Sequence, residues 1–152
     1  MRIALVAMFC AVGLAASGGS GTLAGDKGDL AKELTKFQGT WTFESVEAGG
    51  QKLPADQFKA MTVTFEGDKY SVKMGDLVIE AATLKLDPSK SPKTLDSKVT
   101  DGPNKGKVIL GIYEISGDTL KVCFDEEGKK RPTEFKGVTG SNTLVVHKRV
   151  KK

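Results

Sequence analysis

Short runs of alternating apolar and polar residues, joined by tight turns, fill the chain from position 40 onward and constrain its fold most strongly. In residues 61–74, MTVTFEGDKYSVKM, every second residue is apolar on both sides of Gly67-Asp68. Strict alternation indicates strands with one buried face, and a glycine-containing pair between two such runs indicates a two-residue hairpin turn. Gly-Asp pairs at 75–76 and 117–118 repeat the signal. We therefore expect a series of antiparallel hairpins.

The same pattern extends over the rest of the chain. A short helix is expected over residues 26–37, where Leu30, Leu34 and Phe37 have helical spacing. Within residues 77–87 the apolar phase changes, which indicates a β-bulge or a sharp bend. Eight strands are expected, at residues 40–46, 61–66, 69–74, 77–87, 94–99, 108–115, 119–125 and 143–150.

Eight consecutive antiparallel strands favour one fold class, an all-β, up-and-down β-barrel with a short N-terminal helix. Closure pairs the first strand with the last and leaves no exposed sheet edge. A β-sandwich is the alternative, but sandwiches use longer crossover connections than the Gly-Asp turns found here.

The first 24 residues have the composition of a secretory signal peptide. Arg2 precedes an apolar run and then small residues, with cleavage expected near position 17 or 24. Residues 25–152 would then form one exported domain, periplasmic or extracellular; a buried N-terminal helix is the alternative. Cys10 lies inside the apolar run and not behind small residues, so we do not expect a lipoprotein. The apolar run is shorter than the stretch of about 20 residues that a helix needs to cross a bilayer, so we expect no stable membrane insertion after cleavage. Removal of the leader would leave Cys123 as the only cysteine, packed in a strand and without an internal disulfide.

The only tryptophan, Trp41, stands in the stretch FQGTW at the start of the first predicted strand. This stretch resembles the Gly-x-Trp motif of the lipocalin family. The segments QGTWTFESVEAGGQKLPADQFK, LKLDPSKSPKTLD, TDGPNKGKVILGIYEISGDTLKVCF and KKRPTEF extend the resemblance to a lipocalin-like domain of unknown function that is abundant in planctomycete bacteria. The resemblance implies that Gly39, Trp41 and Arg149 close one end of the barrel, with the guanidinium across the indole. It implies no substrate or catalytic residue.

No enzyme constellation is recognisable in the sequence. His147 is the only histidine, so we expect no metal site and no cofactor, and we assign His147 a surface or capping role. No set of nucleophile, base and orienting group can be named, which favours a non-enzymatic protein. The net charge of +4 is spread without a basic patch interleaved with aromatics, so no nucleic-acid binding is expected.

The barrel interior is where we expect a ligand. An eight-stranded barrel is either filled by its own side chains or holds one small molecule, and the bulky phenylalanines predict a narrow apolar pocket at most. Arg131 would either hold an acidic head group at the mouth or pair with Glu134. We expect a small apolar or amphipathic ligand to contact Phe43, Phe65, Tyr70, Ile112, Phe124 and Arg131. The expected inward set also includes Val63, Val72, Leu84, Leu110, Leu120, Val122, Leu144 and Val146. The alternative is an envelope or secreted protein–protein interaction scaffold with a filled barrel, suggested by VILGIYEI, which is apolar on both faces.

Overall fold

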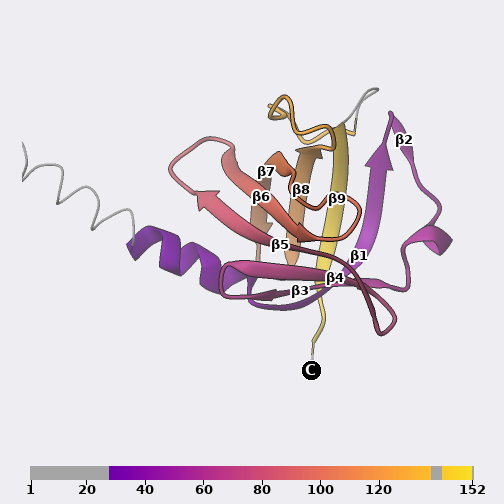
Figure 1. Cartoon of the computed structure of the whole chain (residues 1–152). Coiled ribbons are helices and arrows are strands. Elements are labelled where there is room, and N and C mark those ends of the chain that lie inside the picture. The colour runs from indigo at the N-terminus through magenta and orange to yellow at the C-terminus, as the bar shows by residue number, and fades with distance from the viewer. Residues whose placement is uncertain (1–27, 138–141, 152) are drawn as a thin grey trace, which may run out of the picture.

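The computed structural model describes residues 28–137 and 142–151, which form one helix and one continuous antiparallel sheet (Figure 1). The helix covers residues 28–37. A single 3-10 turn, η2 (Ala55–Gln57), begins after Pro54. The strands are β1 (Gly39–Ala48), β2 (Gln51–Lys52), β3 (Met61–Glu66), β4 (Lys69–Met74), β5 (Leu77–Asp87), β6 (Lys93–Asp101), β7 (Val108–Ser116), β8 (Thr119–Asp125) and β9 (Asn142–Arg149). The predicted leader, with Cys10, lies outside the described residues.

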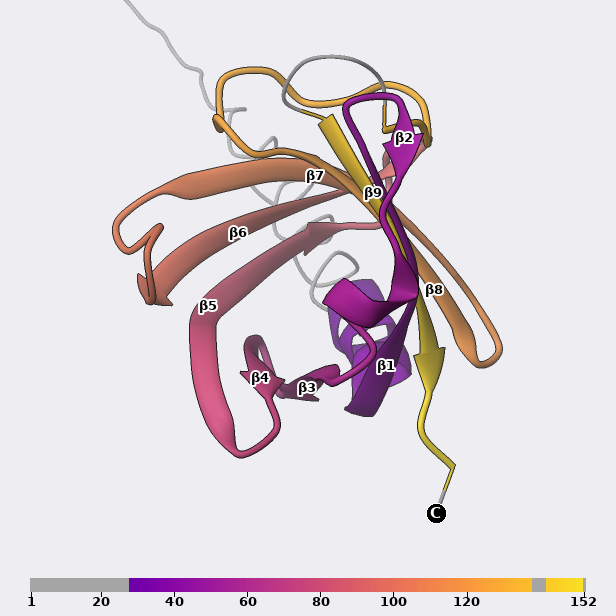
Figure 2. The same cartoon turned by 90° about the vertical axis from the view of Figure 1, so that its right-hand side faces the viewer.

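The sheet closes into a barrel of eight long strands, as predicted. Each strand from β3 to β9 pairs with the next along the chain, β1 pairs with β3, and β1 also pairs with β9. The two-residue β2 pairs only with the end of β1 and lies outside the closed meander. Figure 2 shows the sheet curling round so that β9 runs beside β1. The all-β, up-and-down barrel with an N-terminal helix is confirmed, and the β-sandwich alternative is wrong.

The predicted change of phase in β5 is a bulge at Ile79, and the neighbouring strand β6 has a second bulge. Relative to β4, the register shifts between Val72 and Lys73, so that Ile79 has no partner across the ladder. In the β5–β6 ladder the register shifts between Ala81 and Ala82, where Thr100 of β6 has no partner. Bulges bend a strand and redirect its side chains. As a result, the consecutive residues Ile79 and Glu80 both reach the barrel interior.

One end of the barrel, here called the floor, is closed by the helix of residues 28–37. Phe37 and Trp41 are fully buried there, and Phe37 meets the rings of Phe65 and Tyr113 edge to face at 5.3 and 5.1 Å. Such aromatic pairs contribute about 0.5–1.5 kcal/mol beyond the area that they bury. The floor is therefore solid, and any opening lies at the opposite end.

A buried carboxylate fixes the helix to the barrel wall. Glu33 accepts hydrogen bonds from the Lys93 ammonium (2.8 Å), the Lys36 ammonium (3.0 Å) and the Tyr113 hydroxyl (3.0 Å). Burial alone would raise the pKa of Glu33, but these three donors outweigh it, and the pKa is lowered. Glu33 therefore stays ionised and holds helix and strands together.

The first and last strands meet at the floor through Trp41 and Arg149. The two residues are partners in the β1–β9 ladder, and the guanidinium carbon lies 4.2 Å from the indole centroid. The guanidinium also donates to the Gln38 and Lys36 carbonyls at 2.6 and 2.7 Å. Gly39 has a φ of 109°, which favours glycine, and a Cβ there would lie 3.6 Å from the same guanidinium.

Two strands have the opposite inward phase to the one predicted. In β7, Ile109 and Tyr113 face the interior, so Leu110 and Ile112 face outward. In β9, Val145 and His147 face the interior, so the prediction for Leu144 and Val146 was also wrong. The inward residues predicted for the other strands agree with the structure.

The physical reason is an outer cover supplied by residues 126–137. The Asp125 carboxylate accepts backbone N–H groups of Glu127, Lys129 and Lys130, which shapes the start of this segment. Further along, the Lys136 carbonyl accepts from the Cys123 thiol at 3.5 Å. The outer faces of β7 and β8 are thus covered in part by the chain itself, and Ile112 is only 1% exposed although it points away from the interior.

Candidate binding cavity

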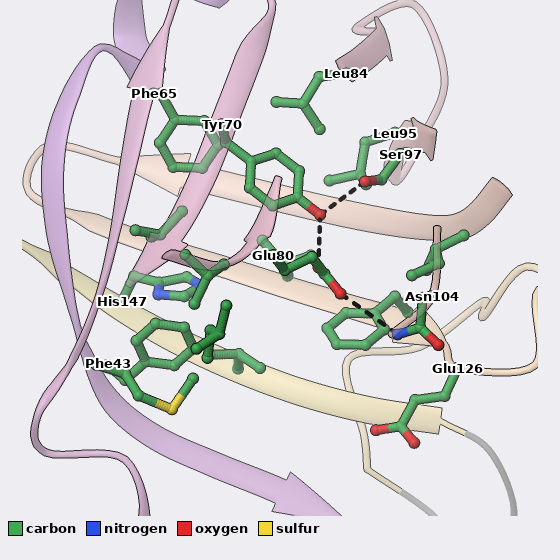
Figure 3. A pocket seen from close by; sticks show the side chains of 18 of the residues that line it. Phe43, Phe65, Tyr70, Glu80, Leu84, Leu95, Ser97, Asn104, Glu126 and His147 are labelled. Atoms are coloured by element: carbon green, nitrogen blue, oxygen red, sulfur yellow. Dashed lines mark hydrogen bonds between the residues drawn. The ribbon is translucent and has the colours of Figure 1, made fainter. Parts of the chain in front are cut away.

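The barrel contains an open cavity of about 750 Å³. Ligand pockets commonly have volumes of about 300–1,000 Å³. The cavity is therefore larger than the narrow pocket predicted from the sequence, because Phe43, Phe65 and Phe124 lie along the wall and do not fill the centre. The wall is made of inward side chains from all eight long strands, shown in part in Figure 3: Phe43, Met61, Val63, Phe65, Tyr70, Val72, Leu84, Leu95, Ser97, Ile109, Val122, Phe124, Val145 and His147.

The two ends of the cavity differ in chemistry. Phe37, from the helix, contributes at the floor. At the opposite end the lining comes from the β6–β7 connection, with Pro103, Asn104 and Lys107, and from Glu126 and Glu127 after β8. The cavity is thus apolar near the floor, and its charged side chains other than Glu80 of β5 belong to the connections at the opposite end.

A hydrogen-bonded polar group interrupts the apolar wall on one side. The Tyr70 hydroxyl lies 2.7 Å from the Ser97 hydroxyl and donates to the Glu80 carboxylate at 3.3 Å; Asn104 donates to the same carboxylate at 3.4 Å (Figure 3). Burial, and secondarily the charge of Glu80, raises the pKa of Tyr70. The phenol therefore stays protonated, and this group of four residues satisfies its own hydrogen bonds.

His147 supplies the second polar feature of the wall. Its ring packs edge to face on Phe43, with centroids 4.6 Å apart, and the residue is only 7% exposed. Burial lowers the pKa of His147 to about 4, although a hydrogen bond with the Thr42 backbone acts in the opposite direction. The imidazole is therefore neutral at physiological pH. Its Nδ1 atom is buried and has no hydrogen-bond partner.

The predicted surface or capping role for His147 was wrong, and a signal for its true place was present in the sequence. Arg149 was expected over the inward-facing Trp41. His147 and Val145 share the parity of Arg149 along the strand, and side chains two residues apart lie on the same face. The closure motif thus already implied that His147 faces the interior.

The structure brings four of the six predicted ligand contacts together. Phe43, Phe65, Tyr70 and Phe124 line the cavity, whereas Ile112 and Arg131 do not. Ile112 belongs to the outward face of β7, as described above.

Arg131 lies on the outer face of the barrel, not at its mouth. Its guanidinium donates to the outward-facing Asp96 at 2.6 Å and to the main-chain carbonyls of Leu95 and Gly111 at 2.9 and 2.8 Å. Glu134, the other predicted partner, pairs with Lys136. Arg131 therefore fastens the outer segment 126–137 to β6 and β7.

Within residues 28–137 and 142–151, no three His, Cys, Asp or Glu side chains are grouped as metal ligands. The Cys123 thiol faces away from the cavity, and burial raises its pKa, which disfavours the thiolate. In the same described part of the chain, no helix has the length and apolar character needed to cross a bilayer.

The fold is an eight-stranded, all-antiparallel meander barrel, and it is consistent with a lipocalin-like fold. Comparisons of the chain with protein-family models, with curated proteins and with solved structures found no match. The assignment to this fold therefore depends on strand order, on closure between β1 and β9, and on the Trp41–Arg149 contact.

Proposed function

We propose that the chain is an exported, non-enzymatic, lipocalin-like protein that binds one small apolar or amphipathic molecule inside its barrel. The observation that carries the proposal is the cavity of about 750 Å³, walled mainly by apolar side chains and closed at the floor. Apolar pockets of this size with a few polar groups are typical of small-molecule sites. The signal-like leader supports export, and the extended sequence resemblance supports membership of the lipocalin-like domain of planctomycete bacteria.

The proposal is tested with a neutral fluorescent dye, N-phenyl-1-naphthylamine, whose emission rises in apolar surroundings. Val122→Trp adds a large ring to the cavity wall, and Lys121→Trp adds the same ring to the exposed outer face of the same strand. We expect the first variant to bind the dye at least tenfold more weakly than the wild type, and the second to bind normally. Absence of dye binding to the wild type, or equal affinities of the two variants, would contradict the proposal.

A second candidate function is contact with another protein, which an apolar patch favours. Met74, Leu77 and Val78, at the β4–β5 turn, are 46%, 68% and 43% exposed. Sedimentation of the protein as a strict monomer at high concentration, with no partner recovered by cross-linking, would argue against this candidate. The strand β7, although apolar on both faces, does not support this candidate, because residues 126–137 cover part of its outer face.

A further inference from the structure

We propose that His147 is the polar anchor of the cavity and that the ligand is a neutral amphiphile whose hydroxyl group donates a hydrogen bond to its Nδ1 atom. The inference rests on the proposed function, since it concerns the ligand of the same cavity. It specifies the class of ligand: an apolar body with one uncharged hydrogen-bond donor.

The first argument is the state of the Nδ1 atom itself. It is buried and lacks a partner, whereas all other fully buried side-chain nitrogens and oxygens in the described part of the chain have one. A buried polar atom without a partner costs about 1–3 kcal/mol. Because His147 belongs to the cavity wall (Figure 3), a molecule in the cavity is the group positioned to supply the missing donor.

The second argument is the direction of the hydrogen bond. Nδ1 is unpartnered, so the hydrogen bond with the Thr42 backbone involves the other ring nitrogen. In a neutral imidazole, one nitrogen carries the proton and the other is an acceptor. With the proton on the nitrogen that faces the Thr42 carbonyl, Nδ1 accepts and cannot donate. The ligand must therefore bring a donor such as a hydroxyl.

The third argument is the charge of the surroundings, which disfavours an anion. The wall next to His147 is apolar: Phe43 packs on the ring, and Met61 and Val145 lie beside Phe43. The titratable groups on the rest of the lining are Tyr70, Glu80, Lys107, Glu126 and Glu127. Three of these five are acidic and one is basic, so a carboxylate in the cavity would meet little compensating charge.

Nδ1 is itself fully covered, so a ligand reaches it only when a neighbouring side chain of the wall moves. Met61 is half-buried in the same cluster as Phe43. Its unbranched side chain adapts easily to a neighbouring group. The ligand's apolar part would then lie against the deeper wall, which Val63, Leu84 and Val122 form.

The test compares two isomeric probes that differ only in the donor: 1-decanol and 1-methoxynonane. Both displace the neutral dye from the full chain if they bind, but only the alcohol can donate to Nδ1. A net hydrogen bond corresponds to about three- to tenfold in affinity. We expect the ratio of alcohol to ether affinity to fall by that factor in His147→Phe, which keeps a ring beside Phe43. Decanoate, the anionic probe, is expected to bind the wild type more weakly than the alcohol.

A second measurement needs no variant. Because His147 is the only histidine in the chain, an untagged ¹⁵N-labelled protein gives one imidazole in its nitrogen spectrum. We expect 1-decanol to move the Nδ1 resonance towards that of a hydrogen-bonded acceptor and 1-methoxynonane to leave it unchanged. This readout remains available even if His147→Phe does not fold.

The outcomes separate the two proposals. Binding of both probes with the same affinity ratio in wild type and variant, or an Nδ1 resonance that the alcohol does not move, overturns the His147 inference alone. Tighter binding of decanoate than of the alcohol, lost in His147→Phe, also overturns it, because Nδ1 would then act as a donor. Failure of the dye and of every probe to bind overturns the proposed function and this inference together.

Discussion

Protonation of His147 should destabilise the fold in mildly acidic solution. The folded-state pKa is about 4, and that of an unfolded histidine is about 6.5. Between these values the unfolded chain binds a proton that the folded chain excludes, so stability decreases as the pH falls. One pKa unit is worth about 1.4 kcal/mol. The free energy of unfolding should therefore fall by about 2 kcal/mol between pH 7 and pH 5, and by about 3 kcal/mol at pH 4.

The assay is urea unfolding at several pH values, followed by the fluorescence of the single tryptophan. His147→Phe removes the titrating group, so its stability should change little between pH 7 and pH 5. Glu33 also has a lowered pKa, but its contribution is lost only below its unfolded value of about 4.5 and is shared by both proteins. Parallel pH profiles for wild type and variant would refute the reasoning, since no other histidine is present.

Two further predictions concern the floor of the barrel. Arg149→Met removes the cation above Trp41 and leaves two main-chain carbonyls without donors, so it should lower the free energy of unfolding by about 2–4 kcal/mol and alter the tryptophan emission. Arg149→Lys keeps the charge but not the two parallel donors of the guanidinium, so its stability should lie between those of the wild type and Arg149→Met. Equal stabilities of the three proteins would contradict this. Glu33→Gln keeps an acceptor for Tyr113 but removes the charge facing Lys93, and we expect a loss of about 1–2 kcal/mol at pH 7 in the same assay. Because the pKa of Glu33 is lowered in the folded protein, this loss should shrink as the pH falls below the unfolded value of about 4.5, and a loss that does not change with pH would point to packing instead.

The position of each strand was predictable because its signals are local. Alternation within residues 61–66 and 69–74, with Gly67-Asp68 between them, specified a hairpin without reference to the rest of the chain. The bulge in β5 was also visible, since a change of apolar phase has few other causes. The small two-residue β2 was not predicted, because so short a strand carries no periodicity.

The inward face of β7 and β9 was not predictable from alternation. Both faces of these strands carry apolar residues, such as Ile112 beside Tyr113 and Val146 beside Val145. Apolar residues on both faces show that both are covered but not which one is inside. A one-residue error of phase moved Ile112 into the predicted site and left His147 out of it.

The sequence by itself determined the number of long strands, their antiparallel order and the closure of the barrel, because alternation, turn residues and the Gly-x-Trp frame act over a few positions. The tertiary structure decided what faces the cavity. Residues 126–137 fold back over the outside of β6–β8, held by Arg131 and by the Asp125 carboxylate, and so provide an apolar environment for residues that alternation had placed inside. Which face of each strand points inward depends on contacts between segments that are far apart in the sequence. In β9 the result is a neutral histidine in the wall of an apolar cavity.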